Sequence, residues 1–69
     1  MHYKPLIADK TEEFFDVLPD YTFGDMLYST IVELSKGRPT ITKSSLRKID
    51  DELFYQALCR ALNKERENG

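Results

Sequence analysis

The apolar residues between positions 49 and 62 recur at the spacing of an α-helix. At 100° per residue they form one continuous sector of a helical wheel, which Tyr55 and Cys59 widen and which leaves only a narrow polar arc. Asp50 suits the N-cap, and the two acidic residues after it suit the positive end of the helix dipole. The pattern predicts a helix from about residue 50, with this apolar sector: Leu53, Phe54, Ala57, Leu58, Ala61 and Leu62.

A second long helix is predicted to begin after Thr22. Thr22 and Asp25 have the spacing of a capping box, while Gly37 and Pro39 are typical of a helix end. The expected polar stripe holds Asp25, Ser29, Glu33 and Lys36. The expected apolar sector is again wide, and its residues are Phe23, Met26, Leu27, Tyr28, Thr30, Ile31, Val32 and Leu34.

Two shorter helices complete the expected fold. One starts from the capping-box spacing of Asp9 and Glu12 and ends before Pro19, and the other covers residues 43–48 after the N-cap candidate Thr42. Residues 1–8 contain Pro5 and are expected to form an extended arm, or a short strand paired with residues 40–42. The prediction is therefore an all-α, single-domain array of two longer and two shorter helices over residues 9–64, with a frayed polar tail at 65–69.

Length and cysteine content restrict the class of protein. A chain of 69 residues forms one domain and buries only about 60% of its unfolded surface, so association would help its stability. A lone cysteine excludes an intramolecular disulfide and fits a reducing compartment, so a cytoplasmic location is expected. No apolar run approaches the roughly 20 residues that a membrane-spanning helix needs, so no membrane partner is expected.

The charges are segregated along the chain. Residues 1–35 carry seven acids and two bases, and residues 49–69 carry five acids and three bases. The stretch between them has five cations and no acid, and its hydroxyl side chains would also suit phosphate contacts. It gives the candidate contacts to phosphate or to an acidic partner: Lys36, Arg38, Lys43, Arg47 and Lys48.

A helix-turn-helix that uses the 50–62 helix for recognition is disfavoured, because the acidic start of that helix would enter the DNA groove first. Non-specific phosphate binding by the basic stretch remains an alternative. The preferred interpretation is a solvated loop, or one that pairs with acids of the same chain.

The sequence offers few groups for chemistry. His2 is the only histidine, and Cys59 has no histidine in an expected helix to activate it. Asp50, Asp51 and Glu52 are consecutive and point about 100° apart on a helix, so they cannot all face one metal ion. Nucleotide-binding and metal-binding motifs are also absent. We therefore expect no catalytic residue, no metal site and no cofactor.

The wide apolar sectors favour a protein partner. Each long helix is apolar over more of its circumference than one core-facing stripe requires. A second copy or another protein would cover the excess at the sector edges, and the candidate interface residues are Tyr28, Val32, Tyr55 and Cys59. The leading hypothesis is a self-associating or accessory interaction module, and the alternatives are a small nucleic-acid-binding regulator and a monomer in which these four residues are ordinary boundary positions.

Overall fold

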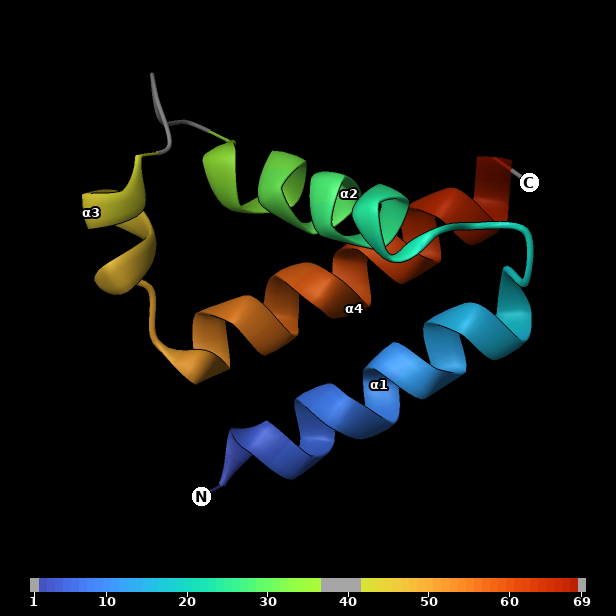
Figure 1. Ribbon diagram of the computed structural model, residues 1–69, viewed down its shortest axis with the longest axis horizontal. Coiled ribbons are helices and arrows are strands. Elements are labelled where there is room, and N and C mark those ends of the chain that lie inside the picture. Colours follow the sequence, from blue (N-terminus) through green and yellow to red (C-terminus); the bar gives the residue numbers. More distant parts are fainter. Residues whose placement is uncertain (1, 37–41, 69) are drawn as a thin grey trace.

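All regular secondary structure in the described part of the chain is helical. The computed structural model describes residues 2–36 and 42–68, and within them it contains no strand. This confirms the predicted all-α fold. The four helices, shown in Figure 1, are α1 (Tyr3–Val17), α2 (Phe23–Ser35), α3 (Lys43–Arg47) and α4 (Asp51–Asn68).

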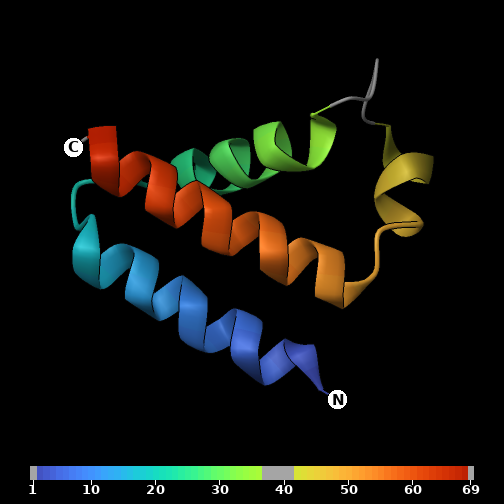
Figure 2. The ribbon, with the colours of Figure 1, turned by 180° about the vertical axis from the view of Figure 1, so that it is seen from behind.

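Helix α4 is the centre of the arrangement. It packs against α1 on one side and against α2 on the other, and the views from both sides show it between them (Figures 1 and 2). Helix α1 runs in the same direction as α4, while α2 runs opposite to both, and α3 lies at the end where α4 begins. The molecule is flat, with extents of 31 × 28 × 17 Å. A large part of each outer helix therefore faces solvent.

One apolar core joins the three long helices. Phe14 of α1 is completely buried. Its ring packs edge-on against the rings of Phe15 and Tyr21, and each pair of ring centroids is 5.7 Å apart. Buried residues from all three long helices form the main cluster: Phe14, Met26, Leu58, Ala61 and Leu62. Because every long helix contributes to the same cluster, the core holds α1, α2 and α4 together as one unit.

The extended arm and the strand alternative expected for residues 3–8 are wrong, because α1 is helical from Tyr3. Pro5 lies in the first turn, where a backbone N–H has no partner within the helix, so its missing donor costs nothing there. Contacts with α4 hold this turn: the Tyr3 and Tyr55 rings are 5.8 Å apart, and the Lys4 ammonium is 2.9 Å from the Asp51 carboxylate. The described residues thus form three long helices and one short helix, and Asp9 lies inside α1 instead of capping it.

The other predicted helix starts are confirmed by hydrogen bonds. Thr22 and Asp25 form both bonds of the capping box at the start of α2. The Thr42 hydroxyl accepts from the Ser45 N–H, and the Asp50 carboxylate accepts from the Leu53 N–H at 2.9 Å. The expected end of α2 at Gly37 and Pro39, and residues 40 and 41 of the strand alternative, lie outside the described residues.

The expected frayed tail is helical through Asn68. The Glu65 carboxylate accepts hydrogen bonds from the Tyr21 hydroxyl at 2.5 Å and from the Ser29 hydroxyl at 3.2 Å. These bonds attach the last turns of α4 to the connection between α1 and α2 and to α2 itself. None of the helices in the described part of the chain has the length and apolar composition to span a membrane.

Candidate interaction surfaces

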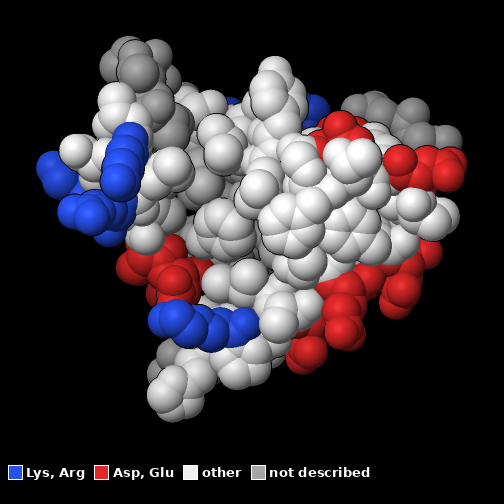
Figure 3. Space-filling view, in the orientation of Figure 1, with Lys and Arg blue, Asp and Glu red and all other residues white. Residues whose placement is uncertain are grey.

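One side of α2 carries no charged side chain from Phe23 around the helix to Val32, and the exposed Asp25 lies at its edge. We call this side the outer face of α2, and its residues are Phe23, Gly24, Leu27, Tyr28, Ile31, Val32 and Ser35. Of the two acids of the helix, Glu33 is buried, and Asp25 forms the capping box at the edge of this face. Phe23 is 58% exposed and Tyr28 is 72% exposed. In Figure 3 the surface over α2 is accordingly largely uncharged.

A pocket of about 210 Å³ lies between the outer face of α2 and the last turns of α4. Ala61 is buried, while Tyr28 is an exposed wall of this pocket. Hydrogen bonds from Tyr21 and Ser29 hold the Glu65 carboxylate in place, and the bond to Glu65 raises the pKa of Tyr21. We call this the α2–α4 pocket, and its lining residues are Tyr28, Ser29, Val32, Ala61, Lys64 and Glu65.

The other two predicted interface residues lie on the opposite side of α4, toward α1. The Tyr55 ring packs against Tyr3, and a hydrogen-bonding contact with the Cys59 side chain raises the pKa of Tyr55. Both residues are half-buried. The structure thus brings Tyr28 and Val32 together on one surface and separates them from Tyr55 and Cys59.

Three cations of the predicted basic stretch gather on and beside α3. Lys43, Arg47 and Lys48 are exposed, and they form no ion pair with any other described residue. Figure 3 shows this basic cluster at one end of the molecule, with acidic side chains next to it. Lys36 is instead paired with Glu33, and Arg38 lies outside the described residues.

Glu33 was expected on a solvated polar stripe, but its side chain is only 4% exposed. The Lys36 ammonium lies 2.7 Å from the Glu33 carboxylate. This contact holds the pKa of Glu33 below its ordinary value, with smaller contributions from Lys64 and Arg60, while burial acts in the opposite direction. A pocket of about 320 Å³ adjoins the pair and is lined by Glu33, Leu34, Lys36, Leu53 and Arg60. The three-residue spacing of Glu33 and Lys36 is the only sign of this pair in the sequence.

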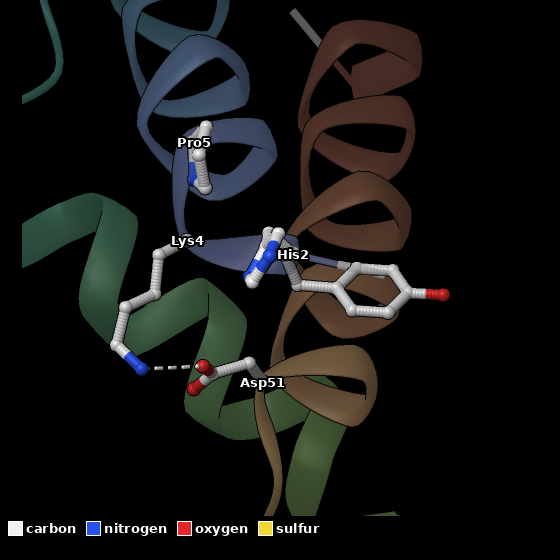
Figure 4. A pocket seen from close by; sticks show the side chains of 5 residues that line it. His2, Lys4, Pro5 and Asp51 are labelled. Atoms are coloured by element: carbon white, nitrogen blue, oxygen red, sulfur yellow. Dashed lines mark hydrogen bonds and ion pairs between the residues drawn. The ribbon is translucent and has the colours of Figure 1, made fainter.

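A third pocket, of about 230 Å³, lies where the first turns of α1 and α4 meet (Figure 4). It is lined by His2, Tyr3, Lys4, Pro5 and Asp51, and Figure 4 shows Lys4 reaching the Asp51 carboxylate. This ion pair joins the starts of the two helices. It gives the Asp51 carboxylate a partner within the chain, so the carboxylate needs no bound ligand. Within residues 2–36 and 42–68, no group of three or more His, Cys, Asp or Glu side chains is placed to hold a metal ion.

Comparison of the chain with protein-family models, with curated proteins and with solved structures finds no match.

Proposed function

We propose that this chain is a non-enzymatic, cytoplasmic interaction module that self-associates through the outer face of α2. The observation that carries the proposal is the exposed, charge-free side of that helix. A small domain usually covers a solvent-facing helix side with charged residues, and an uncharged side with exposed aromatic rings is typical of an interface. The free thiol of Cys59 supports the reducing compartment.

The shape of the molecule also supports association. The molecule is only 17 Å thick, and no described helix covers Tyr28, which is 72% exposed. A chain of this size has a small core, and burial of Leu27 and Tyr28 against another copy would remove further apolar area from water. Self-association therefore supplies burial that the isolated chain lacks.

Gly24 provides a test that leaves every apolar contact in place. It lies on the outer face of α2, and beyond its chain neighbours and its own helix backbone the nearest atom to an added Cβ is the Thr22 hydroxyl oxygen at 3.7 Å, an ordinary contact distance. A Gly24→Glu substitution puts a carboxylate on this face, and in the first turn of a helix that charge favours folding. We expect self-association, measured by sedimentation equilibrium from low to high micromolar concentration, to weaken by about tenfold or more.

Gly24→Ala is the matched control, because it raises helix propensity without adding a charge. It should associate like the unmodified chain. A Gly24→Glu chain that associates as tightly as Gly24→Ala would contradict docking through this face, and an unmodified chain that stays monomeric at every concentration would contradict self-association itself.

The free cations on and beside α3 favour a second candidate function, the binding of phosphate groups in DNA or RNA. If this function holds, the chain shifts the electrophoretic mobility of a nucleic acid at low salt, and added salt reverses the shift because binding releases counterions. Replacement of Lys43, Arg47 and Lys48 by Glu should abolish the shift. The control replaces Lys4, Lys10 and Arg66, which lie outside this cluster, and should preserve the shift. Absence of any shift at low salt would exclude this function.

A further inference from the structure

The Tyr28 side chain projects from the surface directly beside a pocket. At 72% exposure it is the most exposed large hydrophobic side chain among the described residues. It also forms one wall of the α2–α4 pocket, to which α4 contributes Ala61, Lys64 and Glu65. The projecting ring and the open pocket therefore lie directly beside each other.

The pocket has the size and chemistry to receive a tyrosine ring. Its volume of about 210 Å³ is below the roughly 300 Å³ at which sites for drug-sized ligands begin, so it suits a single side chain. Val32 and Ala61 offer apolar contact, while the Lys64 ammonium and the Glu65 carboxylate offer polar contacts to a hydroxyl. Tyr21 and Ser29 already fix the Glu65 side chain, so the polar side of the pocket is formed before any partner arrives.

A projecting side chain beside a pocket that fits it suits a dimer with twofold symmetry, because both subunits then use the same surface patch. Resting on the proposed function, we propose that the partner is a second copy of this chain and that each copy inserts its Tyr28 ring into the α2–α4 pocket of the other. The rim charges agree with this arrangement. Lys64 and Glu65 have opposite signs, so Lys64 of one copy complements Glu65 of the other across the axis.

The first test compares the dissociation constant of the full chain with those of two serine variants. Tyr28→Ser removes the ring that enters the pocket, and we expect it to raise the dissociation constant by about tenfold or more. Phe23→Ser is the control, because Phe23 is another exposed ring of the same helix, packs on Phe15 at 6.1 Å and does not line the pocket. Its effect should stay below about threefold. Circular dichroism on each variant verifies that the helices are intact.

The second test detects the contact directly. Chains carrying Tyr28→Cys are mixed with chains carrying Lys64→Cys, both with Cys59→Ser, under a mild added oxidant. Disulfide-linked pairs of the two chains are expected, and Phe23→Cys mixed with Lys64→Cys should not form them. A dimer that survives Tyr28→Ser at full strength overturns this pairing and leaves the proposed function standing, whereas a monomeric unmodified chain overturns both.

Discussion

The Glu33 carboxylate is buried between α2 and α4, although its spacing along α2 is that of a solvated position. Burial of an ionised group is unfavourable unless a partner of opposite charge compensates it. Lys36 does so from one turn away, with an ammonium-to-carboxylate distance of 2.7 Å. The pair lies at the end of α2, beside Leu34 of α2 and Leu53 of α4.

The pH dependence of stability tests the Glu33 pair. Lys36 holds the folded-state pKa of Glu33 below its ordinary value of 4.5, so the stabilisation is present above that value and is lost as the pH falls through the folded pKa. Glu33→Gln should therefore lower the urea midpoint at neutral pH, and the difference from the unmodified chain should shrink as the pH falls below 4.5. Glu12→Gln, on an exposed α1 residue, should change the midpoint little at neutral or acidic pH. A difference for Glu33→Gln that stays constant into acid would show that the charge of Glu33 does not stabilise the fold.

At the scale of the helices, the sequence predicts those helix starts that are set by hydrogen bonds between residues close together in the chain. The starts at Thr22, Thr42 and Asp50 were predictable because each cap bonds a backbone N–H three residues away. The start of α1 was not, because the contacts that hold it come from α4. Lys4 and its partner Asp51 are 47 positions apart, and the ring of Tyr3 packs on Tyr55. Pro5 was interpreted as a sign of extended chain, but it is equally compatible with a first helical turn.

The candidate interface also depends on contacts between helices, which the sequence pattern of one helix does not give. The helical wheel identified Tyr28 and Val32 as edge positions, and they share one surface in the structure. It identified Tyr55 and Cys59 in the same way, but their sector edge faces α1. A wheel gives the angle of a residue on its own helix and not which neighbouring helix lies at that angle. A partner contact at Tyr28 therefore stays a prediction, whereas the packing does not support one interface that joins all four residues.

At the scale of the molecule, one small core serves three helices, so its loss should unfold the chain as a unit. Leu58 is completely buried in the cluster with Phe14 and Met26, which brings α1, α2 and α4 together. We expect Leu58→Ala to cost about 2 to 5 kcal/mol, from lost burial and the cavity that remains, out of a total of roughly 5 to 15 kcal/mol for a typical domain.

Urea unfolding measures this cost, and two probes distinguish cooperative from local loss. Far-ultraviolet circular dichroism reports all helices, and tyrosine fluorescence reports the four tyrosines, of which Tyr21 packs on Phe14 and Tyr55 packs on Tyr3. Both transitions should move together in Leu58→Ala. Leu53→Ala, on the same helix at 41% exposure, should cost less than about 1 kcal/mol because much of that side chain is already in water. Transitions that separate, or equal costs for the two leucines, would mean that the helices do not depend on one shared core.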